Sequence, residues 1–244
     1  MIVKPKVELL RHTEDLEIIA GQAASLCYSK GGLKRDMSLD EARELLKKIP
    51  KKHKSILEHS SFTFYIEGIS RVGSHQLVRY RIASPSQRSQ RYVYEDDANS
   101  HFPDQLVELM GEEWVEKKMK QTDESYREVI ERYREEGLTG EVANQDARYV
   151  LQNSTETKLF LTLNTNSLLN LLNQRMCFRA QDEIRNVANQ MFSLVYSLAP
   201  TIFDGAGPDC ISFGKCLEGK MSCGRQEELK NYVQFIKCHP RKNN

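Results

Sequence analysis

One short segment, SSFTFYIEGI at residues 60–69, places the tightest limit on how this chain can fold. Phe62, Phe64 and Ile66 alternate there with more polar residues, a period of two that is typical of a strand with one buried face. A second run, VELL at residues 7–10, predicts a shorter strand. Because strands must pair to satisfy their backbone groups, we expect a small antiparallel sheet near the N-terminal half.

Helical patterns fill most of the remaining sequence. Ser38 with Glu41 three residues later matches a capping box at the start of a helix over residues 38–49, and Pro50 is predicted to end that helix. The other predicted helices cover residues 104–136 with a break at Gly111, 141–151, 167–175 and 180–199, the last ended by Pro200. Helices therefore dominate, and the sequence predicts an α+β fold in which helices pack around the small sheet.

The composition changes after residue 204. From Gly205 onward the sequence is rich in Gly, Lys and Cys. The 244 residues are enough to bury one substantial core. We therefore expect a single domain over residues 1–204 and an appended tail of unknown role over residues 205–244.

Charge and hydropathy exclude several classes of protein. Lys plus Arg (35) nearly balances Asp plus Glu (34), so the chain as a whole has no excess charge for binding a polyanion. It has no apolar run of about 18 residues, the length that spans a bilayer. Charges recur throughout the first residues, MIVKPKVELLRHTEDLE, so they lack the apolar core of a signal peptide. We expect a cytoplasmic protein that contacts no membrane.

The cysteines and histidines give no sign of a metal site. The six cysteines show no C-x-x-C pair, and in a reducing compartment we expect them to be free thiols. The spacing of Cys210, Cys216 and Cys223 fits no common zinc pattern. His53 and His59 are six residues apart and do not share a helical face. The expectation is therefore that no metal is bound.

An arginine-rich segment, RYRIASPSQRSQRY, stands out against the balanced net charge. Arg79, Arg81, Arg88 and Arg91 fall within thirteen residues, and residues 71–94 contain five arginines and no acid. Arginine presents forked donors that suit phosphate, and the interspersed Ser and Gln add neutral hydrogen bonds. The segment predicts an anion site, although a basic face paired with acids elsewhere in the chain explains the charge equally well.

A row of asparagines lies in NTNSLLNLLNQR. Asn166, Asn170 and Asn173 lie on or near one stripe of the predicted helix, which Arg175 closes. Asparagine is a poor helix former, so these residues cost stability unless their amides are used. The stripe predicts recognition of a heterocycle or a ribose. Capping and contact with solvent are the alternative.

These segments resemble the flavin-dependent thymidylate synthases. The signature of that family is Arg-His-Arg, seven residues and then Ser, and it stands here as Arg79-Tyr80-Arg81 followed by Ser89. HKSILEHSSFTF, ASLCYS, ARYVL, NTNSLLNLLNQR and AQDEI are similar to further segments of the family, in order and spacing. The resemblance extends from about residue 22 to about residue 195.

The resemblance implies a reaction, its cofactor and an assembly. The reaction is the reductive methylation of dUMP to dTMP in de novo dTMP biosynthesis, with methylenetetrahydrofolate as carbon donor and NADPH-reduced FAD as hydride source. A non-Rossmann fold is implied, which agrees with the lack of a GxGxxG or phosphate-loop motif in the sequence. The family also forms homotetramers whose sites lie between subunits.

The functional positions of the family map onto residues of this sequence. Those that match dUMP-binding positions are Gln76, Arg79, Gln87, Ser89, Arg91, Arg148 and Arg175. Those that match positions around FAD are His53, Ser55, Arg79, Tyr80, Arg81, Gln87, Asn164, Asn166, Asn170 and Arg179. The resemblance implies one catalytic residue, Arg175, which polarises the uracil ring.

Four residues depart from the family pattern. Tyr80 replaces the signature histidine, so a flat ring with a hydrogen-bonding tip remains but the capacity for charge near neutral pH is lost. Arg179 stands where histidine is common and Asn166 where arginine is common. Gln152 stands where proline is usual. These differences affect individual contacts to the flavin. The expected phosphate contacts are unaffected, because the phosphate-binding arginines are present.

Two other functions remain open from the sequence alone. A nucleic-acid-binding module could use segment 79–94, in which Tyr80, Tyr92 and Tyr94 lie among the arginines and could stack on bases. The near-zero net charge argues against it, and we expect no nucleic-acid partner. The other alternative is a flavoprotein of the same fold that acts on a different pyrimidine.

Overall fold

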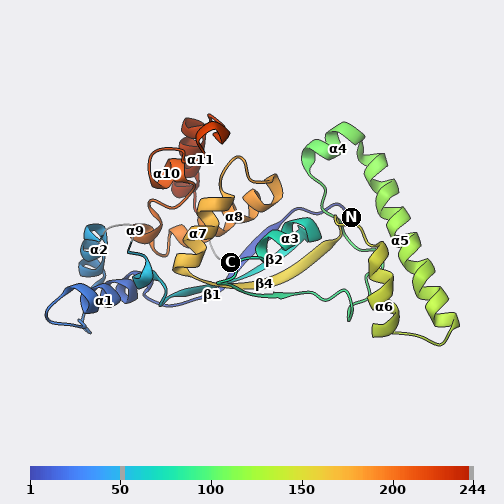
Figure 1. Ribbon diagram of the computed structural model, residues 1–244, viewed down its shortest axis with the longest axis horizontal. Coiled ribbons are helices and arrows are strands. Elements are labelled where there is room, and N and C mark those ends of the chain that lie inside the picture. Colours follow the sequence, from blue (N-terminus) through green and yellow to red (C-terminus); the bar gives the residue numbers. More distant parts are fainter. Residues whose placement is uncertain (50–52, 242–244) are drawn as a thin grey trace. The chain divides into compact units, whose positions relative to one another are not determined.

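The computed structural model describes residues 1–49 and 53–241 (Figure 1). The strands are β1 (Lys6–His12), β2 (Ser61–Ser70), β3 (Ser84–Gln87) and β4 (Glu156–Asn164). The helices are α1 (Leu16–Tyr28), α2 (Leu39–Lys48), α3 (Arg71–Leu77), α4 (Asp104–Met110), α5 (Glu112–Glu135), α6 (Glu141–Ala147), α7 (Thr165–Arg175), α8 (Asp182–Tyr196), α9 (Pro200–Phe203), α10 (Asp209–Ser212) and α11 (Gln226–Cys238). Short 3-10 turns are η1 (Ser55–Leu57), η2 (Arg148–Val150) and η3 (Gly219–Met221). Within the described ranges, no helix has the length and apolar character needed to cross a bilayer.

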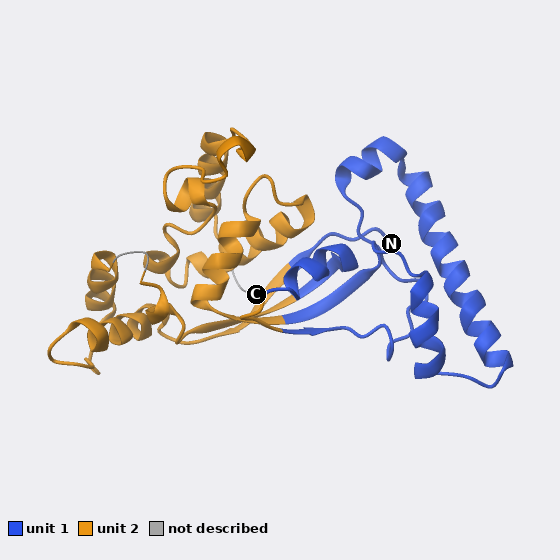
Figure 2. Cartoon of the chain, in the orientation of Figure 1, with its two compact units in different colours: residues 1–6, 66–80, 85–160 blue, residues 7–65, 81–84, 161–244 orange. Residues whose placement is uncertain are grey.

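The chain forms two compact units, each made of several separate stretches (Figure 2). The first unit contains residues 1–6, 66–80 and 85–160, and the second unit contains residues 7–65, 81–84 and 161–244. The predicted tail therefore belongs to the second unit, where α11 contacts α8.

In the part of the chain that the structure describes, the sheet has four strands in the order β1-β2-β4-β3. The end of β1 meets the start of β2, where Thr13 N donates to Ser61 O at 3.0 Å. The end of β4 also meets the start of β2, where Thr165 N donates to Ser60 O at 2.9 Å. The central strand β2 is thus antiparallel to both neighbours. The two predicted strands and the α+β fold class are confirmed.

Sequence reasoning missed β3 and β4. In β4, Leu159, Leu161 and Leu163 are buried with a period of two, but the intervening Phe160 is apolar and 49% exposed, which hides the alternation. β3 contains Pro85, which cannot donate to a ladder, and accordingly it lies at the edge of the sheet.

The predicted helix boundaries are largely confirmed. At the start of α2, Glu41 N donates to Ser38 Oγ at 3.3 Å and Ser38 N donates to Glu41 Oε2 at 3.0 Å, which together form the capping box. Gly111, at φ 83°, separates α4 from α5 as expected. The predicted stop at Pro50 lies outside the described residues.

Two boundaries differ from the prediction. The helix expected to run to Pro200 ends at Tyr196, and Pro200 instead occupies the first position of α9. Proline suits that position because the first amide of a helix has no partner within the helix. The helix expected over 141–151 ends at Ala147 and tightens into η2.

One core cluster of the first unit lies between α5 and α6, which run side by side (Figure 1). Tyr126 and Ile130 of α5 pack with Ala143 and Ala147 of α6, and all four are buried. The small alanines let the two helices approach closely around the tyrosine ring. The Tyr126 hydroxyl accepts a hydrogen bond from Glu95 N at 3.2 Å, so this cluster also fixes the chain just after the arginine-rich segment.

In the second unit, α1 packs against α2, and α7 packs against α8. Phe62 of β2 is fully buried and meets Phe203 of α9 edge to face, with ring centroids 5.8 Å apart. Glu17 of α1 is buried and charged, and it accepts from Arg43 Nε of α2 and from Thr201 N, each at 2.6 Å. These bonds meet the requirement that a buried carboxylate be paired.

Gly68 of β2 occupies a position that no side chain can take. Its φ is +68°, and a Cβ would overlap the carbonyl oxygen of Lys4 on the neighbouring stretch of chain. Its N–H donates to Glu156 Oε1 at 2.9 Å. The glycine therefore allows the close approach of two backbones within the first unit.

We expect Gly68→Ala to lower the free energy of unfolding by about 3 kcal/mol or more, since it adds a steric overlap to the cost of a left-handed backbone. Gly137→Ala is the matched control, because Gly137 has φ +74° and a Cβ added there would meet no atom within 4 Å. The control should cost about 1 kcal/mol. Chemical denaturation of both variants checks this, and equal losses would show that the overlap with Lys4 is relieved without cost.

Candidate functional site

The start of α3 is held firmly within the first unit. Ser70 caps the helix by accepting from Gly73 N at 3.0 Å. Arg71 N and Val72 N donate to the carbonyl oxygens of Thr155 and Asn153 at 3.1 and 3.2 Å. The position of Arg71 is therefore fixed by the backbone.

Arg71 and Arg148 line the same pocket, which has a volume of about 490 Å³. The other lining residues are His75, Gln90, Tyr149, Leu151, Gln152 and Asn153. Burial, and then the charge of Arg148, lower the pKa of Arg71. Gln90 Nε2 is buried and makes no hydrogen bond. Two cations and an unsatisfied donor make this pocket suited to an anion with several acceptor oxygens.

Sequence reasoning placed Arg148 in the site but missed Arg71, His75 and Gln90. A signal for the first two existed, because Arg71 and His75 are four residues apart and share one face of α3. Gln90 gave no signal, since only its buried Nε2 distinguishes it from other glutamines of the segment.

Two arginines of the arginine-rich segment have acidic partners that the segment itself lacks. Arg88 NH2 lies 2.7 Å from Glu95 Oε2, and Arg91 pairs with Glu141. Burial raises the pKa of Glu95 to about 6, and the nearby Arg88 only partly offsets this. The alternative interpretation of pairing with acids elsewhere in the chain is thus correct for Arg88, which was not among the predicted site residues, and for Arg91, which was.

The remaining predicted residues of the first unit lie around α3 and β3. Gln87 Nε2 donates to Ser74 Oγ at 2.8 Å and to Thr157 Oγ1 at 3.2 Å, so its amide nitrogen is bonded within the chain. Ser89 Oγ accepts from Arg91 N at 3.2 Å. The residues Gln76, Arg79 and Tyr80 lie in or just after α3, and of these Arg79 is exposed.

In the second unit, predicted flavin residues gather on η1 and α7, two elements in contact. Asn166 Nδ2 donates to Glu58 Oε1 at 2.9 Å, which ties α7 to the residue after η1. Ser55 begins η1 and is exposed. Asn164 Oδ1 accepts from Ser167 N at 2.8 Å and caps α7. One atom of the Asn164 amide is therefore used to cap the helix.

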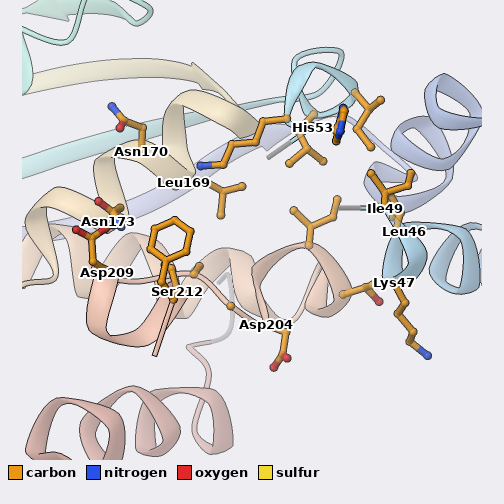
Figure 3. Close-up of a pocket in the computed structure, with 18 residues that line it drawn as sticks. Leu46, Lys47, Ile49, His53, Leu169, Asn170, Asn173, Asp204, Asp209 and Ser212 are labelled. Atoms are coloured by element: carbon orange, nitrogen blue, oxygen red, sulfur yellow. Dashed lines mark hydrogen bonds between the residues drawn. The ribbon is translucent and has the colours of Figure 1, made fainter. Parts of the chain in front are cut away.

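His53 and Asn170 line one pocket of about 420 Å³ in the second unit (Figure 3). Apolar side chains such as Ile49, Leu169 and Phe213 form much of its wall. The His53 ring contacts Tyr28, whose hydroxyl lies 3.0 Å from Nδ1.

Asn173 lines the same pocket, but its side-chain amide is used to hold two parts of the chain together. Its Nδ2 donates to Asp209 Oδ1 at 2.9 Å and to Gly207 O at 3.1 Å, and Figure 3 shows the two side chains together. Asn170 Oδ1 accepts from Gln174 Nε2 at 3.3 Å. The asparagines of the stripe thus have different roles. Asn170 is available at the pocket, and Asn173 holds α10 in place.

The remaining predicted cations of the second unit lie on three segments. Arg175 ends α7 and is half-buried, while Arg179 is exposed and lies 2.5 Å from Glu218 of the tail. Arg81 is exposed in the stretch 81–84. Among the residues that the structure describes, no three or more His, Cys, Asp or Glu side chains are arranged as ligands of a single metal ion.

Glu95 makes stability depend on pH. Its folded pKa of about 6 exceeds the ordinary 4.5, so its contribution is fully present below about pH 4.5 and is lost as the pH rises through about 6. Relative to a Glu95→Gln variant, wild type should lose about 2 kcal/mol of unfolding free energy between about pH 4 and pH 7. Denaturation across that range checks this, with Glu131→Gln on the exposed side of α5 as control. If the unfolding free energy of wild type changes with pH in parallel with that of Glu95→Gln, the raised pKa of Glu95 is contradicted.

Comparison with known proteins decides the family. The family model described as Thy1, thymidylate synthase complementing protein, matches residues 8–201. The chain is 41% identical to the flavin-dependent thymidylate synthase of Clostridium tetani, over 92% of this chain and 95% of that protein. It is 43% identical to that of Geobacter sulfurreducens, over 92% and 96%. The chain belongs to the flavin-dependent thymidylate synthase family. The family resemblance expected from the sequence is confirmed, and the nucleic-acid-binding alternative has no support.

A solved structure agrees with the fold of this family member. A UMP/dUMP methylase, PolB, from Streptomyces cacaoi, bound with 5-Br dUMP, superposes with a TM-score of 0.68 and covers 84% of this chain and 97% of that one. The two sequences are 23% identical, so the likeness concerns the fold alone. The expected non-Rossmann architecture is confirmed.

Proposed function

We propose that this family member catalyses the reductive methylation of dUMP to dTMP, with methylenetetrahydrofolate as carbon donor, FAD as hydride source and NADPH as reductant. Methylenetetrahydrofolate supplies the carbon with its two hydrogens, and one hydride that originates in NADPH completes the methyl group. The proton displaced from C5 of uracil and one further proton balance the tetrahydrofolate that is released, and NADPH leaves as NADP⁺. The observation that carries this proposal is the pocket in which Arg71, Arg148 and the unsatisfied Gln90 Nε2 meet.

The pocket of Arg71 and Arg148 binds the phosphate of dUMP in this proposal. A phosphate monoester carries up to two negative charges and three terminal oxygens, which match two guanidinium groups and one amide donor. Burial is the main cause that lowers the pKa of Arg71, and the charge of the ligand offsets the second cause, repulsion from Arg148. Arg91 and Ser89 lie on the segment that follows β3 and supply further donors. The methylase with the same fold was solved with a dUMP analogue bound, which is consistent with this class of ligand.

Arg175 is proposed as the catalytic residue. It is half-buried at the end of α7, where a planar guanidinium can hold two oxygen or nitrogen acceptors at once. Negative charge that develops on the uracil ring during methylation is stabilised by such a preorganised donor. Lysine keeps the charge but cannot make the paired contact.

The residues of η1 and α7 fit a flavin. The pocket of His53 and Asn170 combines apolar walls with an imidazole and an amide, the mixture that holds a flat heterocycle. Asn166 and Ser55 flank it with polar groups, and Arg81 offers a charge for a phosphate. When bound, FAD supplies the stored electron pair that no ordinary side chain can hold. The residues of this chain bind and orient the flavin, and their apolar side chains lie against its ring.

Assembly, location and domain limits are part of the proposal. Tyr149 and Tyr92, next to two of the proposed nucleotide-binding arginines, are 82% and 67% exposed, as expected if a neighbouring subunit of a homotetramer covers them.

The six cysteines are free thiols, which suits the proposed location in the reducing cytoplasm. The family match ends at residue 201, close to the proposed limit between the domain at 1–204 and the tail at 205–244.

Turnover measured with wild type and Arg175→Lys tests the function. Wild type should form dTMP only when FAD, NADPH and methylenetetrahydrofolate are all present. UMP in place of dUMP tests the selectivity for the sugar, and dCMP in place of dUMP tests the selectivity for the pyrimidine. Arg175→Lys should keep bound flavin, bind dUMP more weakly and lose roughly two to three orders of magnitude in turnover, the scale of one lost transition-state donor. Wild type that forms no dTMP contradicts the function. A Lys variant that turns over normally contradicts only the role of Arg175.

Nucleotide affinity tests the phosphate pocket. Arg71→Met and Arg148→Met should each weaken dUMP binding by roughly 10- to 100-fold, since each removes a charge-assisted contact. Binding of deoxyuridine, which lacks the phosphate, should stay within about twofold of wild type. Arg132→Met is the control, because Arg132 forms only exposed pairs on α5 with Glu135 and Glu136. Titration of flavin absorbance measures both ligands, and equal loss of dUMP and deoxyuridine affinity would contradict the assignment.

A further inference from the structure

Segment 88–95 carries three donors of the proposed nucleotide site. Ser89 and Arg91 match dUMP-binding positions of the family, and Gln90 lines the pocket of the first unit. Gln90 Nε2 is buried and has no hydrogen bond to any described residue. Because the segment lies between β3 and α4 and forms neither helix nor strand, contacts with other elements must fix its conformation.

Backbone hydrogen bonds hold the two ends of the segment. Arg88 N donates to the carbonyl oxygen of Lys158 in β4 at 2.9 Å. Glu95 N donates to the Tyr126 hydroxyl of α5 at 3.2 Å. The ends are thus attached to two different elements, and neither bond alone sets the shape of the chain between them.

One side-chain pair joins the first residue of the segment to the last. Arg88 NH2 donates to Glu95 Oε2 at 2.7 Å. The Glu95 side chain is 1% exposed and that of Arg88 is 29% exposed, so this charge-assisted bond is largely shielded from water. The other pair of the segment, Arg91 with Glu141, is exposed and therefore holds the chain less firmly. The buried pair thus limits the positions of the donors that lie between its two residues.

The environment of Glu95 shows that its charge is not there to stabilise the fold. Burial raises the pKa of Glu95 to about 6, and Glu156 of β4 raises it further. The attraction of Arg88 and of Arg71 in α3 only partly offsets this. At about pH 8 the carboxylate is therefore ionised at a cost in stability. A buried ion pair that does not stabilise the fold can instead specify a geometry.

We propose that Glu95 is a positioning residue of the nucleotide site, which acts through Arg88 to hold the donors of segment 88–95 where they meet the phosphate. The proposal rests on the proposed function, because dUMP is the ligand that these donors bind. A direct contact is ruled out by charge, since a carboxylate repels a phosphate. Arg88, which matches no dUMP-binding position, is the link between Glu95 and the segment.

Two single variants, studied at about pH 8, separate positioning from a direct effect of charge. Glu95→Gln keeps the shape of the side chain and should fold, because ionised Glu95 lowers stability at that pH. Positioning predicts that Glu95→Gln and Arg88→Met both weaken dUMP binding, by roughly 3- to 10-fold. Charge alone predicts opposite signs, because loss of an acid strengthens the attraction for phosphate and loss of an arginine weakens it. Unchanged or tighter binding by Glu95→Gln overturns the proposal.

The double variant tests whether the two side chains act together. Glu95→Gln combined with Arg88→Met should bind dUMP no more weakly than the weaker single variant, since the pair is already broken in each. The KM for dUMP should rise by a similar factor in all three variants, while kcat stays within about threefold of wild type. Losses of affinity that add in the double variant show independent roles and contradict the positioning by this pair.

Arg127→Met is the matched control for these variants. Arg127 pairs with Asp96 and Asp97, which directly follow segment 88–95. Because this pair lies outside the segment, its loss should leave dUMP affinity within about twofold of wild type. A loss as large as that of Glu95→Gln would show that any contact near the segment has this effect, and would overturn the specific role of Glu95.

Amide hydrogen exchange of the ligand-free protein tests the proposal without nucleotide. Val93 N donates to Ser89 O at 3.0 Å, so exchange of this amide reports on the turn within the segment. It should be roughly 10-fold faster in Glu95→Gln than in wild type, and unchanged in Arg127→Met. Unchanged exchange in Glu95→Gln overturns the proposal. Wild type that binds no dUMP contradicts the proposed function instead, and exchange then still decides whether Glu95 holds the segment.

Discussion

The first unit must hold two positively charged guanidinium groups in one pocket. Arg71 and Arg148 line the same pocket, and burial together with the second charge lowers the pKa of Arg71. Like charges repel more strongly in a partly buried site than in water, so the surroundings must hold them in place. The backbone bonds at the start of α3 fix Arg71, and the charge of Glu95 offsets part of the repulsion. In the proposed function, the phosphate of the nucleotide offsets the rest.

Short-range sequence patterns predicted the elements whose signals depend on residues close together in the chain. The alternation in β2, the capping box of Ser38 and Glu41 and the break at Gly111 all depend on neighbours within four residues. β4 was missed because the exposed Phe160 masks its alternation. The arrangement of the pocket was missed for a different reason, since Arg71, Gln90 and Arg148 come together only through the tertiary fold.

Resemblance to a family supplied residues that physical patterns alone could not. No local pattern singles out Arg148 in the sequence, yet it lines the pocket. The same resemblance said nothing about Arg88, whose charge is satisfied by Glu95, or about the capping role of Asn164. Nor could spacing reveal that the turn after α7 contacts the tail, because the pair of Arg179 and Glu218 forms only in the folded chain.

A crystal structure of the protein with FAD and dUMP tests the central claim most directly, namely that the pocket of Arg71 and Arg148 binds the phosphate of the nucleotide. We predict phosphate oxygens within hydrogen-bonding distance of both guanidinium groups, with Gln90 Nε2 donating to a third oxygen or to a bridging water. Density for dUMP whose phosphate contacts neither Arg71 nor Arg148 would contradict the account.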